Sequence, residues 1–179
     1  REPHDADDGT SPTRAAVGSL VGLIFMSKRP RDDDFLSSLD VGRILGEGAF
    51  AKVHHAKRGG SSYALKLVSR QHPDAATVAA LERDVLRAIG AHKHIVSLVE
   101  YAETADAYAL LLELAEGGEV FDRICEGPYS EADAATVVRQ VATALVHMHS
   151  KGICHRDLKP ENILLTSRAS DADVKVADF

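Results

Sequence analysis

The sequence has few cysteines and therefore no framework for disulfide bonds. Cys125 and Cys154 are the only two among 179 residues, and one of them lies inside an apolar run. Secreted domains that depend on disulfides carry many more. With 45% hydrophobic residues, the chain can still bury a core of its own. We therefore expect one globular domain in an intracellular, reducing compartment, the cytoplasm, with the nucleus as the alternative.

The sequence also lacks an excess of basic charge. It contains 21 Lys and Arg against 27 Asp and Glu, a net charge of −6, and the acidic residues are spread along the chain. A protein whose main partner is nucleic acid gathers basic residues on one face. We therefore expect no nucleic-acid partner.

No hydrophobic run is long enough to cross a membrane. The run AAVGSLVGLIFM, residues 15–26, has twelve residues, whereas a membrane helix needs about twenty. Aspartates precede it where a secretory signal has basic residues. The KRPR patch that follows is interpreted as a solvated charge cluster and not as a nuclear-import signal. We assign residues 1–34 to a disordered N-terminal segment, in which Met26 would make a sensible start, and we expect no membrane partner.

From residue 35 onward the hydrophobic pattern is regular. It predicts five β-strands at residues 41–50, 51–57, 62–68, 95–101 and 108–114. A helix is predicted between the third and fourth strands, starting at Pro73 and Asp74 and ending at Gly90.

Helices dominate the second part of the chain. A short helix is predicted at residues 119–125, after a break at the glycines of EGG. A long helix is predicted to begin at Ser130, with Asp133 as its capping partner, and to end at Lys151 and Gly152. Two short strands complete the pattern.

The segment GEGAFAKV, residues 46–53, joins the first two predicted strands. Glycine-rich backbone of this kind can bring N–H groups to phosphate oxygens. The segment is followed by a strand, which argues against a dinucleotide-binding turn, and it lacks the Gly-Lys-Ser/Thr of a Walker motif. Taken alone, it fits a plain hairpin turn without a ligand equally well.

Lys66 stands between apolar residues of the third predicted strand. Such a lysine either extends its amine to solvent or is held by a carboxylate, because an unpaired buried ammonium is costly. Glu82, on the flank of the apolar stripe of the following helix, is a candidate partner.

The segment HRDLKPEN, residues 155–162, concentrates polar groups between two apolar runs. It supplies Asp157, Lys159 and Asn162, and Asp178 follows after the next strand. A carboxylate and a carboxamide suit a hard cation with oxygen ligands, and a second carboxylate with a lysine suits acid–base work on a phosphoryl acceptor. Together with a glycine-rich loop, these are the parts of a phosphoryl-transfer site.

Four motifs occur in an order that resembles the first part of a eukaryotic protein kinase domain: LGEGAFAKV, YALK, HRDLKPEN and the final DF. The resemblance covers about residues 35–179. The lysine at position 159, in HRDLKPEN, resembles the pattern of serine/threonine kinases and not that of tyrosine kinases. The segment LELAEGGEVFDRI resembles the calcium/calmodulin-dependent group, including calcium-dependent kinases.

The resemblance implies an α+β fold with two lobes. The N-lobe and hinge would span residues 35–115, as a five-stranded antiparallel sheet with one inserted helix. Residues 116–179 would be the start of a mainly helical C-lobe, up to and beyond the catalytic loop.

The resemblance also implies ATP and Mg²⁺ as ligands and gives the polar residues their roles. Lys66 would contact the ATP phosphates and be held by Glu82. Asp157 would accept the proton of the substrate hydroxyl, and Lys159 would neutralise charge on the moving phosphoryl group. Asn162 and Asp178 would hold Mg²⁺.

The positions implied to surround ATP include the glycine-rich loop, the adenine pocket and the ribose contact. They are Leu45, Gly46, Glu47, Gly48, Ala49, Phe50, Ala51, Val53, Ala64, Lys66, Leu112, Glu113, Ala115, Glu119 and Leu164. Among them, Ala51 stands where the family has a third glycine, Leu112 would be the gatekeeper, and Glu119 would reach the ribose. The backbone of Glu113 and Ala115 would bond the adenine edge. A hydrophobic stack of Leu86, Leu98, His155 and Phe179 would link the lobes.

In the family, D-F is followed by glycine, the activation segment and the rest of the C-lobe, and the sequence stops before them. We therefore expect a fragment that does not itself transfer phosphate, with the apolar stripe of its long helix, which includes Val141 and Met148, left uncovered. Two hypotheses stay open. The chain belongs to an ATP-dependent serine/threonine kinase acting on proteins with basic residues upstream of the target, or it is a non-catalytic module that binds nucleotide or a partner. The complete set of catalytic residues favours the first.

Overall fold

The structure, a computed structural model, describes residues 32–48 and 51–179. The apolar run and Met26, which belong to the segment predicted to be disordered, lie in residues 1–31, outside the described residues. Helix α2 (Asp32–Ser37) begins three residues before position 35, where the sequence placed the start of the domain. Phe35, within this helix, and Leu39, shortly after it, are 4% and 7% exposed and are buried in a cluster with residues of the sheet.

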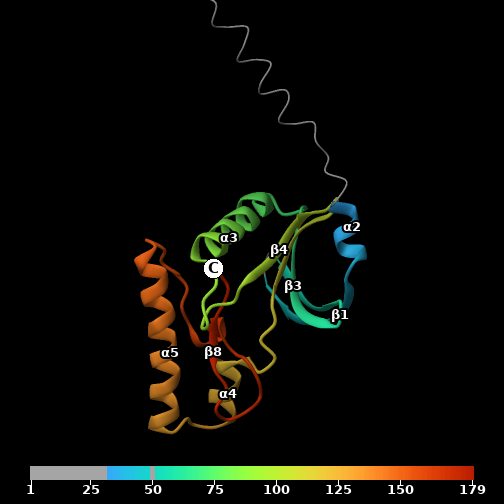
Figure 1. Cartoon of the computed structure of the whole chain (residues 1–179). Coiled ribbons are helices and arrows are strands. Elements are labelled where there is room, and N and C mark those ends of the chain that lie inside the picture. The colour runs from blue at the N-terminus through green and yellow to red at the C-terminus, as the bar shows by residue number, and fades with distance from the viewer. Residues whose placement is uncertain (1–31, 49–50) are drawn as a thin grey trace, which may run out of the picture. The chain divides into compact units, whose positions relative to one another are not determined.

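Five antiparallel strands form the N-terminal lobe (Figure 1). They are β1 (Asp40–Glu47), β2 (Ala51–Arg58), β3 (Ser61–Ser69), β4 (Leu98–Glu103) and β5 (Ala107–Glu113), in the spatial order β1-β2-β3-β5-β4. All neighbouring strands pair antiparallel. The predicted five-stranded antiparallel sheet is therefore confirmed.

Helix α3 (Ala75–Ile89) is the inserted helix between β3 and β4. Gly90 ends it with a positive φ of 69°, and its N–H donates to the Leu86 carbonyl. The buried residues of α3 recur at helical spacing and include Ala79, Glu82 and Leu86. This spacing turns Glu82 toward the sheet, together with the apolar face of the helix.

The two faces of the sheet are covered by different helices (Figure 1). On the α3 face, Val68 and Leu110 share a hydrophobic cluster with residues of α3. On the other face, Phe35 of α2 packs in a cluster with Leu65 and Leu111. Because side chains alternate along a strand, Leu65 faces α2 while its neighbour Lys66 faces the α3 side.

Strand β4 begins at Leu98, later than the predicted strand at residues 95–101. The residues before it pair with another part of the chain. Ile95 forms a parallel bridge with Val176, Val96 N donates to Val176 O at 2.9 Å, and Val176 N donates to His94 O at 3.0 Å. The strand is shortened because these backbone groups bond to the C-terminal lobe instead of to β5.

The C-terminal lobe combines helices with a small sheet. Its elements are β6 (Gly118–Glu119), α4 (Val120–Glu126), α5 (Glu131–Ser150), the 3₁₀-helix η1 (Pro160–Asn162), β7 (Ile163–Leu165) and β8 (Val174–Val176), with sheet order β6-β7-β8. Strand β6 was not predicted from the sequence. The cap of α5 is confirmed, because Ser130 Oγ accepts the N–H of Asp133 at 3.1 Å.

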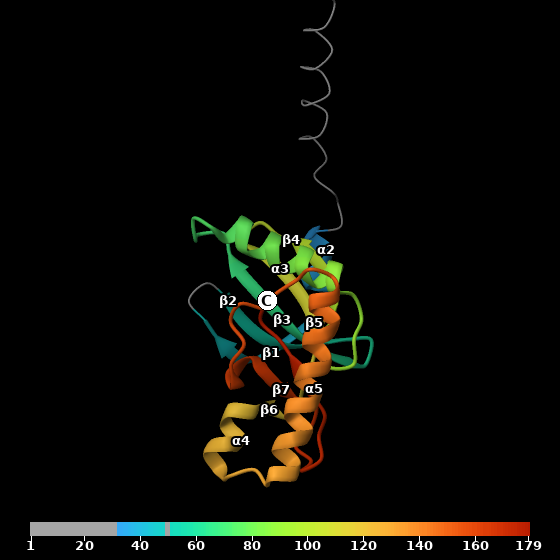
Figure 2. The same cartoon turned by 90° about the vertical axis from the view of Figure 1, so that its left-hand side faces the viewer.

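The apolar stripe of α5 is covered, so the prediction that it stays exposed is wrong. Val141 is 8% exposed and Met148 is fully buried. Both belong to a cluster with Ile95, Leu165 and Val176. Figure 2 shows α5 running beside the small sheet. Strand β8 and the segment before β4 supply the packing partners, and both are already present within the chain.

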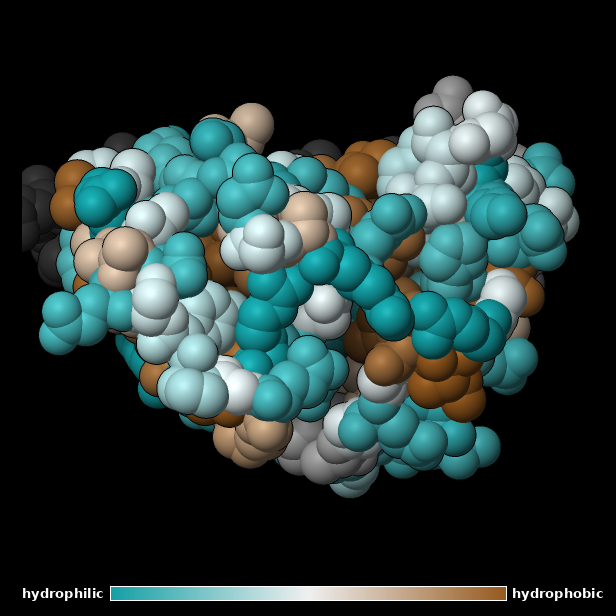
Figure 3. Space-filling view, turned by 90° about the horizontal axis from the view of Figure 1, so that it is seen from below, coloured by the Kyte–Doolittle hydropathy of each residue, from teal (hydrophilic) through white to brown (hydrophobic). Residues whose placement is uncertain are grey.

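The surface seen from below is mainly hydrophilic, with hydrophobic patches between the polar side chains (Figure 3). Val138 and Val146, on the outer side of α5, are 66% and 70% exposed. Within residues 32–48 and 51–179, no helix has both the length and the apolar character needed to span a membrane.

Candidate active site

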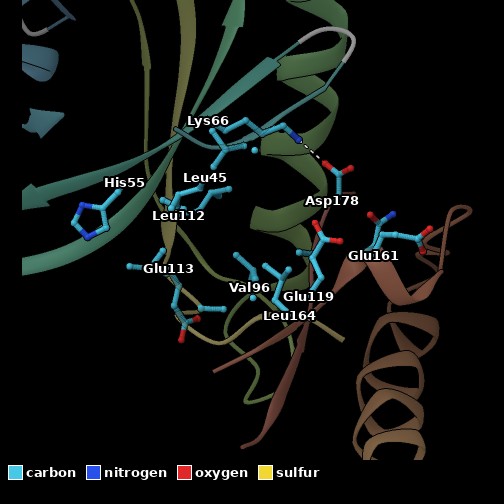
Figure 4. A pocket seen from close by; sticks show the side chains of 18 of the residues that line it. Leu45, His55, Lys66, Val96, Leu112, Glu113, Glu119, Glu161, Leu164 and Asp178 are labelled. Atoms are coloured by element: carbon cyan, nitrogen blue, oxygen red, sulfur yellow. Dashed lines mark hydrogen bonds and ion pairs between the residues drawn. The ribbon is translucent and has the colours of Figure 1, made fainter. Parts of the chain in front are cut away.

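A cavity of about 840 Å³ lies where β1, β2, β3 and β5 meet the segment after β5, β7 and the end of the chain. Its lining includes thirteen of the fifteen positions predicted to surround ATP: Leu45, Gly46, Glu47, Gly48, Ala51, Val53, Ala64, Lys66, Leu112, Glu113, Ala115, Glu119 and Leu164. The other two, Ala49 and Phe50, lie outside the described residues. Figure 4 shows Lys66 reaching across the cavity toward Asp178.

Lys66 is held by two carboxylates from distant parts of the chain. Its Nζ lies 2.8 Å from Glu82 of α3 and 2.7 Å from Asp178 Oδ1. The side chains of Lys66 and Glu82 are only 13% and 3% exposed, whereas that of Asp178 is 59% exposed. Lys66 is therefore a paired, largely buried cation and does not extend its amine to solvent.

Burial and charge compete at this ion pair. Burial lowers the pKa of Lys66, but Glu82 and Asp178 outweigh it, so this pKa lies above its usual value. Burial raises the pKa of Glu82, and Lys66 offsets that rise only in part. The cation is thus secure at neutral pH, while the charge on Glu82 depends on Lys66.

Asp157, Lys159 and Asn162 form a second polar group beside the cavity. Asp157 Oδ2 lies 2.9 Å from Lys159 Nζ and accepts a hydrogen bond from Asn162 Nδ2 at 3.1 Å. The same Asn162 nitrogen donates to the Asp157 carbonyl at 2.8 Å. Asn162 lines the cavity, whereas Asp157 and Lys159 lie beyond its lining.

The hydrogen bond from Lys159 lowers the pKa of Asp157, with further help from Asn162. We expect Lys159→Met to raise the pKa of the Asp157 carboxyl toward its usual range, because the main stabiliser of the charged form is removed. The measurement is an NMR titration of the Asp157 carboxyl in residues 1–179. Lys151→Met is the matched control, since Lys151 Nζ donates to the Ala88 carbonyl. An unchanged Asp157 titration in Lys159→Met would contradict the assignment.

Asn162 and Asp178 together fit a Mg²⁺ ion. Both line the cavity. The amide nitrogen of Asn162 is occupied by Asp157, which leaves its oxygen, a hard donor like the Asp178 carboxylate, for a cation. No cluster of three or more His, Cys, Asp or Glu suited to a metal occurs in the described part of the chain. Mg²⁺ usually keeps several waters and binds through one or two carboxylates plus substrate phosphates, and Asp178 supplies one such carboxylate beside the Asn162 oxygen.

The predicted hydrophobic stack is assembled in the structure. Leu86, Leu98 and Phe179 pack in one cluster. The His155 ring lies 4.9 Å from that of Phe179, centroid to centroid, and its Nε2 lies 2.9 Å from the Ala177 carbonyl oxygen. His155 thus holds the backbone of Ala177, the residue before Asp178. Asp178 itself adopts a positive φ of 64°.

Sequence reasoning missed part of the cavity wall. The additional lining residues are Arg43, His55, Val96, Leu114, Glu116, Gly118, Asp122, Glu161, Arg168 and Ala177. Glu161, inside HRDLKPEN, could have been found from the motif. Burial raises the pKa of Glu119, as do the nearby Asp122 and Glu161, so three carboxylates crowd one end of the cavity.

Gly117 lets the segment after β5 approach β7. Its N–H donates to Leu165 O at 2.8 Å. A Cβ at this position would overlap the Ser167 carbonyl oxygen and come within 2.5 Å of Leu165 Cβ. The first glycine of EGG, read from the sequence only as a break, is therefore required by a close backbone contact.

We expect Gly117→Ala to lower the free energy of unfolding by about 1–3 kcal/mol, because backbone must shift to admit the methyl group. Denaturant unfolding of residues 1–179 measures the change. Gly127→Ala is the control, since a Cβ there meets nothing within 4 Å. Equal stability of the two variants would show that the contact at Gly117 relaxes without cost.

Comparisons with known proteins agree with this geometry. A family model described as protein kinase domain matches residues 39–179. The chain is similar to a calcium/calmodulin-dependent protein kinase of Metarhizium anisopliae, with 37% identity over 90% of this chain and 43% of that protein. A probable myosin light chain kinase of Dictyostelium discoideum is 39% identical over 84% of this chain and 40% of its own length.

A mammalian relative gives the same picture. The calcium/calmodulin-dependent protein kinase type IV of Rattus norvegicus is 43% identical over 95% of this chain and 36% of that protein. The chain thus spans about two fifths of the length of these curated relatives.

Proposed function

This chain belongs to the protein kinase family, and we propose that it is the nucleotide-binding part of a serine/threonine protein kinase. The reaction is transfer of the γ-phosphoryl group of ATP to serine or threonine hydroxyls of proteins. Similarity to calcium/calmodulin-dependent kinases and the lysine at position 159 support this class.

One observation carries the proposal: Lys66 joins Glu82 and Asp178 at the wall of a cavity of suitable size. These three residues come from β3, α3 and the end of the chain, up to 112 positions apart. The fold thus brings a cation and two carboxylates together at a glycine-rich loop. This matches the arrangement that orients a nucleoside triphosphate in protein kinases.

Different parts of the cavity wall suit different parts of ATP. Val53, Ala64 and Leu164 supply an apolar slot for the adenine ring, and the backbone of Glu113 and Ala115 supplies hydrogen-bonding groups along its edge. The glycine-rich loop, with Gly46 and Gly48, covers the phosphates, and Glu119 binds the ribose. Lys66 binds the α- and β-phosphates.

The second polar group performs the chemistry. Asp157 orients the acceptor hydroxyl and takes its proton, which its lowered pKa allows at neutral pH because the carboxylate is charged. Lys159 neutralises charge that develops on the transferred group. Asn162 and Asp178 would hold Mg²⁺, which would neutralise charge on the phosphate oxygens.

The acidic end of the cavity favours basic protein substrates. Asp122 and Glu161 line it beside Glu119, and each of these two is a partner for a basic side chain upstream of the target hydroxyl. We expect peptides with arginine before the serine to be phosphorylated more efficiently than peptides without it.

The test has two arms. Calorimetry with residues 1–179 should detect binding of Mg-ATP, and a protein that continues beyond Phe179 through an activation segment and complete C-lobe should phosphorylate a serine peptide. We expect residues 1–179 to bind Mg-ATP without transferring phosphate. Binding without transfer in the longer protein would support a non-catalytic nucleotide-binding module instead. Absence of binding in both would refute the proposal.

A further inference from the structure

Lys175 is a buried lysine with no role in the site described above. It lies in the middle of β8, three residues before Asp178, and is 9% exposed. Its neighbours Val174 and Val176 are buried as well. A buried ammonium is costly unless it is paired and hydrogen-bonded. The groups that pair with Lys175 therefore indicate which parts of the fold it holds together.

The partners of Lys175 come from two other segments. Its Nζ lies 2.9 Å from Glu113 Oε1, at the end of β5. It also donates to the carbonyl of Lys93, in the segment between α3 and β4, at 2.8 Å. The amine of Lys93 pairs separately with Asp173 at 2.9 Å, so only the backbone carbonyl of Lys93 contacts Lys175.

Glu113 carries the contact on to the wall of the cavity. Its Oε2 accepts the N–H of Ser97 at 3.3 Å, and its own N–H donates to the Ser97 carbonyl at 2.9 Å. Glu113 lines the cavity, and its carboxylate end lies away from Lys66 (Figure 4). The Glu113 side chain thus ties the last residue of β5 to Ser97, the residue before β4, and to β8.

The contact between Lys175 and Glu113 connects two edges of the cavity. On one side is the backbone after β5, which the proposed function assigns to the adenine edge. On the other side, β8 runs from Lys175 to Asp178, which is bonded to Lys66. The Lys175 side chain is 11% exposed and that of Glu113 is 36% exposed. An ion pair that buries a charge is often replaceable by apolar residues without loss of stability, so stability by itself gives no reason for this one.

We infer that Lys175 is a positioning residue: from β8, and through Glu113, it fixes the adenine-binding edge of the cavity. The inference rests on the proposed function, because it requires adenine to bind at that edge. Lys175 does not touch the nucleotide and acts through Glu113.

The experiment measures binding of adenosine and of Mg²⁺-tripolyphosphate to residues 1–179 by calorimetry. Lys175→Met should weaken adenosine binding on the order of tenfold, by analogy with the lower end of the loss seen when a group that orients a metal ligand is removed. Tripolyphosphate binding should stay as in the wild type, because Lys66 and Glu82 are untouched. The Glu113→Gln/Lys175→Met double variant should bind adenosine no more weakly than Lys175→Met, since both changes break one contact.

Lys93→Met is the matched control. It removes the more exposed ion pair with Asp173 in the same region and should leave both affinities unchanged. Lys175→Arg keeps the charge and should restore most of the adenosine affinity.

The outcomes separate cleanly. Adenosine binding unchanged in a folded Lys175→Met, or adenosine and tripolyphosphate weakened equally, would overturn the inference and leave the proposed function standing. If Lys175→Met does not fold, the double variant, which carries no unpaired charge, decides in the same way. A wild-type chain that binds neither adenosine nor Mg-ATP would overturn the proposed function and this inference with it.

Discussion

Replacement of Asp157 by asparagine is expected to lower the rate of phosphoryl transfer by about 10²–10⁴-fold, the usual contribution of a positioned general base. The carboxamide keeps the size of the side chain but cannot accept the proton of the acceptor hydroxyl. The rate is measured with a serine peptide in the protein extended through a complete C-lobe. Binding of Mg-ATP should change little, because Asp157 lies outside the cavity lining.

Asp171→Asn is the control for this change. Asp171 is an exposed aspartate in the turn between β7 and β8, so its replacement should leave the rate unchanged. Thermal unfolding of both variants should match the wild type. A folded Asp157→Asn variant with wild-type turnover would remove Asp157 from the mechanism.

Replacement of Lys66 by methionine is expected to destabilise residues 1–179 by about 3–5 kcal/mol near neutral pH, as loss of one partner of a buried ion pair does. The change leaves Glu82, with a side chain only 3% exposed, without its cation. The same variant should lose Mg-ATP affinity, because Lys66 is the proposed phosphate contact.

The destabilisation should depend on pH in a defined direction. Burial already raises the pKa of Glu82, and the charge of Lys66 lowers it. Removal of Lys66 must therefore raise the pKa of Glu82 further. A group with a raised pKa in the folded state stabilises the fold at low pH, and that stability is lost as pH rises through the folded value. The difference in melting temperature between Lys66→Met and the wild type should therefore be larger in mildly alkaline than in mildly acidic buffer.

Two further variants test this explanation. Lys66→Met/Glu82→Gln should recover much of the lost stability, since no buried charge remains. Lys52→Met breaks an exposed ion pair with Glu47, whose side chains are 55% and 58% exposed, and should cost at most about 1 kcal/mol. A Lys66→Met melting difference that is the same at both pH values would show that Glu82 does not become the uncompensated charge.

The sequence by itself determined the elements that depend on local rules. Alternating and helical spacing of apolar residues located the five strands and α3, because periods of two and 3.6 residues each bury one face. Gly90 and Ser130 marked helix ends, since a positive φ and a side-chain oxygen at the cap act over only a few residues. The order of the motifs located the cavity residues through family resemblance, which the geometry then brought together.

Tertiary structure alone decided which distant groups meet. The sequence offered Glu82 as a partner for Lys66, but only the fold added Asp178, which is 112 positions away. It also took Ile95 from the predicted strand for a bridge to Val176. The physical reason is the same in each case: periodicity and caps are set by neighbours in the chain, whereas ion pairs, bridges between lobes and the close approach at Gly117 depend on how separately formed elements pack.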